Sequence, residues 1–396
     1  MANIANNKVE CLMLFLLTFS YVLSDRFVDG RRIGTSKLVK PKGTIKTIEG
    51  KDGDIIDCVD LYQQPAFDHP LLKNHTIQME PSSTPSDLKV NFSPVKLIQG
   101  WHKRGQCPEA TIPIVRSPKN QHLRALRHFK RSRTQLKQSL DSNDGDILSN
   151  HEYAVVSFGG ENFLGSHATI NIWKPIVEGN GEMSIGQIWV LAGPEEEINT
   201  LEAGWRVDSD QKSKFFIYWT SDGYQKTGCE NLDCPGFVQT NKNFAIGSPL
   251  DVSVYNSKQV DIGVTIYKSN ESWWLKVNDQ VIGYWPQSIY NYLANSATRL
   301  DYGGEIYNAK VGGVHTKTQM GSGHFPSEGY GKASYFRHVQ YMDSTGGFKD
   351  VEVGKLTVDA MKPSCYNIAV QSDRSPGSGT NFYFGGPGYS KDKCPR

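Results

Sequence analysis

Residues 261–285 read DIGVTIYKSNESWWLKVNDQVIGYW, and this stretch decides the fold. Apolar residues recur with a period of two or nearly so over 261–267, 272–277 and 280–285, which predicts three β-strands. Asn278-Asp279 separates the last two and predicts a hairpin turn. Similar strand patterns occur at residues 153–158, 168–174, 187–191, 200–207, 215–220 and 251–255.

Many short strands joined by glycine-rich turns predict an all-β protein, an antiparallel β-sandwich of jelly-roll-like type. A parallel sheet is disfavoured because the crossover helices that it needs are missing. One helix is expected at residues 287–297, after Pro286. Its single face would carry Ile289, Tyr292, Leu293 and Ser296.

The N-terminus has the pattern of a signal peptide. Lys8 precedes an apolar run at 11–23, which is too short to span a bilayer. Residues 1–24 are therefore predicted to be removed, and the protein is expected to be secreted, either to the extracellular space (the apoplast) or to the vacuole. No membrane contact is expected afterwards.

Residues 25–145 form a smaller, mixed region that we interpret as a pro-domain. It ends in a basic run from Arg116 to Lys137 and a turn-rich linker at 139–146. A processing protease would cut such a segment. A solvated helix is an equally good interpretation of the basic run, and the two are compatible. A heparin or nucleic-acid patch lacks the interleaved aromatics that stack on bases. Residues 146–396 then form the β-sandwich domain.

Six cysteines follow the signal peptide, and an even number in an exported chain predicts disulfides. Fifteen pairings are possible, and pairing neighbours keeps each bridge within one region. The favoured pairs are Cys58–Cys107, Cys229–Cys234 and Cys365–Cys394. No metal site is predicted, because Cys229 and Cys234 lack a second pair or a nearby histidine. Acceptor sequons for N-glycans begin at Asn74, Asn91 and Asn270.

The composition of the chain and the absence of several common motifs limit the classes of function that it could have. A formal net charge of +2 gives no global argument for a nucleic-acid partner or an anionic membrane. The chain has no Gly-x-Ser-x-Gly elbow, no His-Glu-x-x-His and no phosphate-binding Gly-x-x-x-x-Gly-Lys. No cofactor is indicated. Hydrolase chemistry would therefore depend on carboxylates.

Two glutamates are the candidates. Residues 200–207 alternate so that Glu202 lies opposite the apolar face, beside Gly204, which could leave room for a substrate backbone. Glu305 follows two glycines that permit close approach. Gln187 would lie on a neighbouring strand. Either glutamate alone is most often merely a solvated side chain.

Several long and unusual stretches lie downstream of residue 151: residues 201–205 (LEAGW), 218–224 (YWTSDGY), 236–239, 273–275, 283–286, 303–305 (GGE), 318–323 and 384–388. In these stretches the chain resembles the neprosin family of plant glutamic peptidases, whose founding activity is that of a prolyl endopeptidase. Residues 107–114, Cys-Pro-Glu-Ala-Thr-Ile-Pro-Ile, resemble the family's activation-peptide region. Two departures are visible, Tyr302 in place of tryptophan and Glu230 in place of an aromatic residue.

The resemblance implies a β-sandwich whose catalytic glutamate pair falls on Glu202 and Glu305, made as a zymogen with a removable, inhibitory pro-domain. Proline-containing peptides would be the substrates. Two facing carboxyls that share one proton can act as base and acid without a covalent intermediate. Glu202 is the expected base and Glu305 the acid, although the roles could be reversed. Gln187 would stabilise the oxyanion or position water.

Aromatic residues could form the floor of a substrate site, and Tyr218, Trp219 and Tyr302 are the candidates, although core packing explains most such rings equally well. Trp273, Trp274, Tyr284 and Trp285 belong to the same group. A non-catalytic carbohydrate-binding or cell-wall protein is the alternative, since an aromatic-rich sandwich can also bind sugars. A glycosidase, which also uses paired carboxylates, is a third reading.

Overall fold

The structure is a computed structural model that describes residues 38–50, 53–85, 99–117, 150–310, 314–371 and 378–394. The predicted signal peptide, residues 118–149 of the basic segment and linker, and the sequon at Asn91 lie outside the described residues. Residues 39–396 cluster as one compact unit. None of the described helices is long and apolar enough to cross a membrane.

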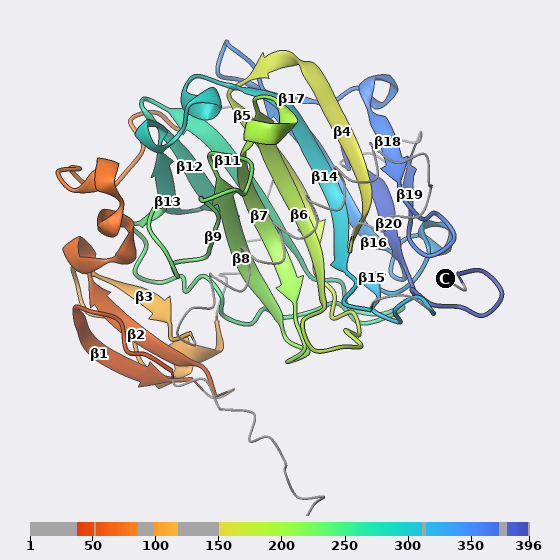
Figure 1. The fold of residues 1–396 in the computed structure, drawn as a ribbon, viewed down its shortest axis with the longest axis horizontal. Coiled ribbons are helices and arrows are strands. Elements are labelled where there is room, and N and C mark those ends of the chain that lie inside the picture. The colour runs from red at the N-terminus through yellow and green to blue at the C-terminus, as the bar shows by residue number, and fades with distance from the viewer. Residues whose placement is uncertain are drawn as a thin grey trace, which may run out of the picture. The chain divides into compact units, whose positions relative to one another are not determined.

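Two antiparallel sheets form the main body (Figure 1). The first sheet has seven strands in the order β18 (Thr357–Ala360), β4 (His151–Phe163), β14 (Ala297–Tyr307), β6 (Met183–Ala192), β7 (Asn199–Val207), β8 (Ser213–Thr220) and β9 (Cys229–Glu230).

The second sheet has ten strands. Eight follow the order β10 (Val238–Gln239), β13 (Gln280–Pro286), β12 (Ser272–Val277), β11 (Asp261–Ser269), β5 (Gly165–Asn171), β16 (Ser334–Met342), β20 (Phe382–Gly386) and β15 (Met320–Gly321). The other two are β17 (Phe348–Asp350), which pairs with β16, and β19 (Asn367–Val370), which pairs with β20. The predicted all-β sandwich is confirmed.

The core lies between the two sheets, where alternate residues of each strand point inward. Ile188 and Leu201 of the first sheet belong to the same buried cluster as Ile170 and Trp273 of the second. Asn278 adopts a positive φ of 54° in the turn that joins β12 to β13, as the hairpin prediction requires.

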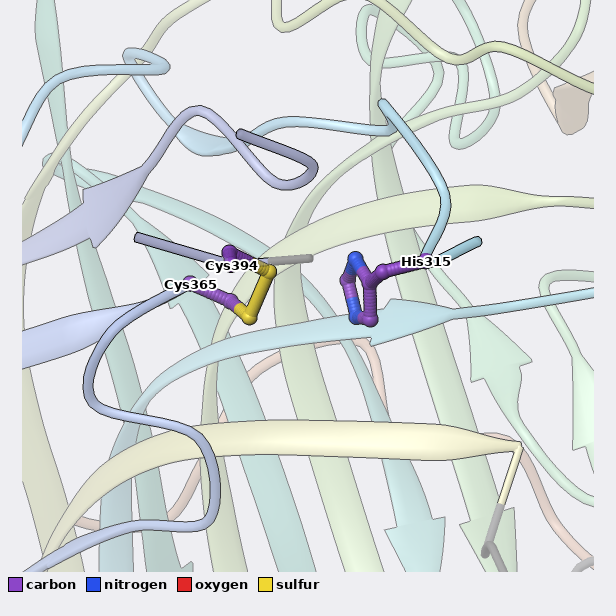
Figure 2. A group of neighbouring side chains, drawn as sticks. All are labelled: His315, Cys365 and Cys394. Carbon is purple, nitrogen blue, oxygen red and sulfur yellow. A yellow bond between two sulfur atoms is a disulfide. The ribbon is translucent and has the colours of Figure 1, made fainter. Parts of the chain in front are cut away.

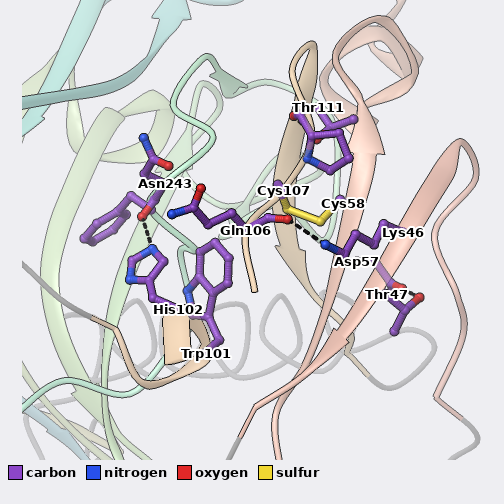
Figure 3. The surroundings of a disulfide bond; sticks show 12 residues. Lys46, Thr47, Asp57, Cys58, Trp101, His102, Gln106, Cys107, Thr111 and Asn243 are labelled. Atoms are coloured by element: carbon purple, nitrogen blue, oxygen red, sulfur yellow. Dashed lines mark hydrogen bonds between the residues drawn. A yellow bond between two sulfur atoms is a disulfide. The ribbon is translucent and has the colours of Figure 1, made fainter. Parts of the chain in front are cut away.

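The N-terminal region adds a three-stranded antiparallel sheet of β1 (Thr44–Glu49), β2 (Ile55–Asp60) and β3 (Thr111–Val115). A disulfide joins Cys58 of β2 to Cys107, and Trp101 lies buried beside it (Figure 3). The short 3₁₀ helices of this region are η1 (Leu61–Gln63), η2 (Pro65–Asp68), η3 (Pro70–Leu72) and η4 (Gly100–Arg104).

The remaining disulfides are Cys229–Cys234 and Cys365–Cys394, so all three bridges join the neighbouring cysteines that the sequence favours. The described sequon residues Asn74 and Asn270 are both exposed. The other 3₁₀ helices are η5 (Glu195–Glu197), η6 (Gln287–Ile289), η7 (Tyr292–Ala294), η8 (Pro326–Glu328) and η9 (Val353–Lys355).

Two predicted elements are wrong. The helix at 287–297 is absent: η6 ends at Tyr290, whose extended φ and ψ break the helix, and the Asn291 side chain begins η7 by accepting from the Tyr292 N–H. The strand at 251–255 is also absent. A turn closes there through the bond from the Val254 N–H to the Lys258 carbonyl, and Asn256 takes a positive φ of 52°.

Candidate active site

Three adjacent strands of the seven-stranded sheet bring the candidate residues together. Strand β6 lies between β7 and β14, so Gln187 of β6 faces Gly204 on one side and Gly303 on the other. Glu202 lies two residues from Gly204, and Glu305 lies two residues from Gly303. Because side chains on one face recur every second residue, all three candidates share the face that points away from the core.

The glycines beside Gln187 are required by the strands themselves. A Cβ on Gly204 would stand 2.1 Å from the Gly186 carbonyl oxygen, and one on Gly303 would stand 2.2 Å from the Ala154 oxygen. Gly303 also has a φ of 151°. The close approach expected at Gly204 is therefore to the neighbouring strand, which explains the glycine without a substrate.

Glu305 receives several donors. The amide Nε2 of Gln187 donates to its Oε2 over 3.2 Å, and Tyr153 donates to its Oε1 over 3.4 Å. The Nδ1 of His151 is in direct contact with the same Oε1. Glu305 and His151 are both buried. Side chains of β4 and β6 thus hold the Glu305 carboxyl in place.

Glu202 has a different set of polar neighbours. Its Oε1 accepts from Thr200 over 2.8 Å and from Tyr224 over 2.7 Å, and the side chain is buried. Burial raises the pKa of Glu202 to about 7, and the charge of Glu305 adds to this effect, whereas donation by Tyr224 opposes it. The two carboxyls therefore differ in environment. Glu202 therefore retains its proton in mildly acidic solution.

This burial should make stability depend on pH. An unfolded glutamate ionises near its ordinary pKa of 4.5, whereas folded Glu202 does so near 7. The folded state therefore binds the extra proton between these values, and the free energy of unfolding should fall as pH rises through that window, by on the order of 3 kcal/mol. Glu202→Gln should remove this loss.

Thermal unfolding of the wild type and the Glu202→Gln variant from pH 4 to pH 8 tests this expectation. The variant should be as stable as the wild type near pH 4 and clearly more stable above pH 7. The exposed Glu195→Gln is the matched control and should follow the wild type. Parallel curves for the wild type and Glu202→Gln would contradict the raised pKa.

The candidate substrate residues lie on opposite faces of the seven-stranded sheet. Tyr218 pairs with Glu202 across β7 and β8, so it lies on the site face. Tyr302 and Trp219 lie on the opposite face, toward the core. Tyr302 is fully buried between the sheets and accepts a 2.8 Å hydrogen bond from Ser166. Trp219 belongs to the core cluster.

The structure adds polar neighbours that the sequence patterns did not single out. His151, Tyr153, Thr200 and Tyr224 all contact one of the two glutamates. Of these four, only Thr200 could be placed at the site from the sequence, because it lies two residues before Glu202 and therefore on the same face of the strand. Tyr224 comes from the loop after β8, where no periodic pattern places a side chain.

A charged group extends the same face. Glu230 of β9 lies opposite Tyr218, and Arg206 of β7 reaches it over 3.1 Å. Arg206 also pairs with Asp208 over 2.7 Å. The Arg206 charge is thus balanced by one carboxylate in β9 and one just after the end of β7. The unusual residue at position 230 therefore places a buried ion pair beside the candidate site.

Metal ligands are offered by one described cluster, His315 with Cys365 and Cys394 (Figure 2). The two sulfurs are bonded to each other, so neither is a free thiolate ligand. His315 directs Nδ1 to the Thr316 carbonyl and Nε2 to Glu152. Its polar contacts are those of a buried structural histidine.

Two buried glutamates thus lie on either side of one glutamine, on one face of a β-sandwich. Residues 180–387 match the family model Neprosin, and residues 47–157 match the model Neprosin activation peptide. The chain belongs to the neprosin family, and it carries the family's activation peptide.

Several solved structures are similar in fold. Scytalido-glutamic peptidase with a peptide-based transition state analogue shares 12% identity and a TM-score of 0.32, covering 59% of this chain and 97% of that one. SCP-B, an eqolisin-family peptidase bound to the tripeptide Ala-Ile-His, shares 10% identity and a TM-score of 0.30, covering 59% and 96%. The carbohydrate binding module CBM66 from Bacillus subtilis shares 13% identity and a TM-score of 0.21. That match covers 38% of this chain and 72% of the module. These scores are low, so the family assignment rests on the sequence match.

Proposed function

We propose that the protein is an acid glutamic endopeptidase, made as a zymogen, which hydrolyses peptide bonds by general acid and base catalysis with Glu202 and Glu305. The observation that carries this proposal is the arrangement of the two carboxyls on either side of Gln187, with different environments. The other candidate residues have weaker support, since Trp219 and Tyr302 belong to the core.

The proposed reaction uses water as the nucleophile. Glu305 accepts a proton from water as the water oxygen bonds to the carbonyl carbon of the peptide. The carbonyl oxygen then carries negative charge, which a donor such as the Gln187 amide stabilises. Glu202 gives its proton to the departing nitrogen as the C–N bond breaks. The products are a carboxylic acid and an amine, and no covalent intermediate forms.

This assignment reverses the roles expected from the sequence. The base takes a proton from water, and this role is left to Glu305, whose carboxyl accepts from Gln187 and contacts His151. An acid must hold a proton at the working pH, and the pKa of about 7 gives Glu202 that property. The two groups titrate together, so apparent values belong to the pair.

The substrate class and the compartment extend the proposal. Cleavage after proline follows from the family resemblance, and proline-containing peptides are the proposed substrates. The N-terminal region acts as an intramolecular inhibitor of the uncut chain. Both glutamates are buried in the full-length chain, so atoms that cover them must move before a peptide reaches them. Secretion follows from the predicted signal peptide and the three disulfides.

The test is incubation of the acid-treated protein with a library of proline-containing peptides across pH 3 to pH 8, with cleavage sites determined by mass. We expect cleavage in acid, with rates falling as the pH passes about 7 because Glu202 then loses the proton that it must donate. Preference for bonds after proline should appear as a shared residue before the cut. A protein that binds polysaccharide but cuts no peptide at any pH would favour the carbohydrate-binding alternative.

A further inference from the structure

A groove lies on the ten-stranded sheet where β19 pairs with β20, close to the short helix η8 (Figure 1). It encloses about 660 Å³. Ligand sites in proteins typically measure roughly 300 to 1,000 Å³, so this groove is large enough to hold a small molecule or a segment of a chain.

Strand alternation places the groove on the face that points away from the core. Phe382, Phe384 and Ile368 belong to the core cluster between the sheets. Their neighbours Tyr383 and Ala369 are cross-strand partners that point the opposite way, and both line the groove. The candidate glutamates lie on the outer face of the other sheet, so the groove is separate from the candidate active site.

Two aromatic rings give the groove its apolar surface. Phe325, which precedes η8, and Tyr383 both line it, and both are partly exposed. Tyr383 meets Tyr335 edge-on at 6.3 Å between ring centroids, and Tyr335 stacks with Tyr330 at 5.7 Å. Tyr330 is 67% exposed. Exposed aromatic surface of this kind can pack against a flat apolar face, such as the C–H face of a sugar ring.

The polar side chains of the groove offer both donors and acceptors. Asn367 Oδ1 accepts from the Ile368 N–H over 2.8 Å, whereas its Nδ2 has no partner in the described chain. Gln371 Nε2 donates to the Ala369 carbonyl over 3.3 Å, which leaves its Oε1 open. The Tyr383 hydroxyl also lacks a partner among the described residues. A ligand rich in hydroxyls suits this set, because each hydroxyl both donates and accepts.

One of the described residues that line the groove is charged. The ammonium of Lys393 lies 6.0 Å from the centre of the Phe325 ring and forms no ion pair within the described chain. Glu328 of η8 does not line the groove, and its carboxylate accepts from Tyr255 over 3.1 Å and contacts His324 over 2.9 Å. A neutral groove with one unpaired cation favours an anionic ligand.

A disulfide holds two walls of the groove in place. Ser364 and Lys393 each precede a cysteine of the buried Cys365–Cys394 bridge. The backbones of Ser390 and Cys394 also exchange two hydrogen bonds, of 3.0 and 2.9 Å, which close the turn that carries Lys393. A rigid groove loses little conformational freedom when a ligand binds, so less of the binding energy is lost.

We propose that this groove binds an acidic polysaccharide, with one sugar ring packed against Tyr383 and a carboxylate of the chain beside Lys393. The polymer can continue beyond the groove, because the lining residues Ser327 and Ser364 are exposed. A proline-rich peptide fits less well, since proline has no N–H to donate to Gln371 Oε1. Binding would hold the protein on a polysaccharide matrix and leave the other sheet free.

The experiment is isothermal titration calorimetry of the full chain at pH 6 with three probes: a hexamer of galacturonic acid, the neutral cellohexaose and octaproline. The acidic hexamer should bind, and added salt should weaken it by screening the pair with Lys393. Cellohexaose should bind about tenfold more weakly, because it lacks the charged partner. No binding by the acidic hexamer, or tighter binding by cellohexaose or octaproline, would overturn the proposal.

Variants then locate the binding in the groove. Tyr383→Ala should weaken both sugars about tenfold through loss of the ring, whereas Lys393→Ala should weaken the acidic hexamer alone, to the level of cellohexaose. Lys393 is exposed, so its replacement tests the groove in a folded chain even where Tyr383→Ala unfolds. The exposed Tyr62→Ala and Lys103→Ala are the matched controls and should change neither affinity.

Asn367→Asp tests the charge preference with the local backbone kept intact. It retains an oxygen that can accept from the Ile368 N–H, but it replaces the open Nδ2 donor by a negative charge. The acidic hexamer should therefore lose more affinity than cellohexaose does. Unchanged affinity for the acidic hexamer in both Lys393→Ala and Asn367→Asp would show that the sugar binds elsewhere. Neither outcome depends on peptidase activity, so this inference holds or fails separately from the proposed function.

Discussion

Replacing Glu202 or Glu305 by glutamine should abolish peptide hydrolysis. Each change removes one proton-transfer group and keeps the size of the side chain, and one such transfer contributes about 10²- to 10⁴-fold to the rate. The double variant should lose little more than either single variant, because the two carboxyls act as one unit. Initial rates at the acid optimum, with the pro-region cut by an added protease, provide the measurement.

Folding must be shown to be intact in the same samples. Thermal unfolding should give both glutamine variants a transition, with Glu202→Gln no less stable than the wild type, for the reason given by its raised pKa. Glu195→Gln, exposed and outside the site, should retain full activity. Full turnover by either site variant would show that the pair is not the catalytic machinery.

Much of the fold could be predicted because strand alternation is a local property. Each of the three strands in 261–285 appears at the expected place, and the Asn278 turn has the backbone that a tight hairpin needs. The helix at 287–297 failed because helical spacing over so short a stretch competes with the local hydrogen bond of Asn291. The strand at 251–255 failed because the chain turns there, through the bond from the Val254 N–H to the Lys258 carbonyl and the positive φ of Asn256.

Parity along a strand also explains which candidates face the site. Glu202 lies on the outward face, as its alternation predicts. The same rule applied to 301–305 puts Tyr302 on the face opposite Glu305, and the structure finds it buried against Ser166. Tyr302 was a candidate for its aromatic ring, whereas counting by twos places it on the core side.

The order of the strands in the sheet could not be predicted from local sequence patterns. The sequence around residues 187, 202 and 305 does not indicate that β6 lies between β7 and β14, because the order depends on contacts between residues distant in sequence. The family resemblance supplied the pairing of the two glutamates. It did not supply His151 or Tyr224, which contact Glu305 and Glu202 respectively.

Gln187→Ala should lower kcat by about 10²- to 10³-fold, the effect usual for one lost oxyanion donor, with little change in KM. Its Nε2 donates to Glu305, and its Oε1 has no hydrogen-bond partner among the described residues although it is buried. A buried acceptor left open in this position suits a water molecule or a peptide N–H. The amide would therefore contact the reacting groups as well as orient Glu305.

Two further variants separate these roles in rate measurements against pH. Gln187→Glu adds a third carboxyl of the same shape beside Glu202 and Glu305, so mutual repulsion should favour protonation and move the acid limb of the kcat profile to higher pH. Ser184→Ala on the same strand removes a hydroxyl with no hydrogen-bond partner in the described chain and should leave kcat unchanged. An unchanged kcat in Gln187→Ala would mean that the glutamine only fills space between Gly204 and Gly303, and the oxyanion donor must then be sought among Tyr153, Tyr218 and Tyr224.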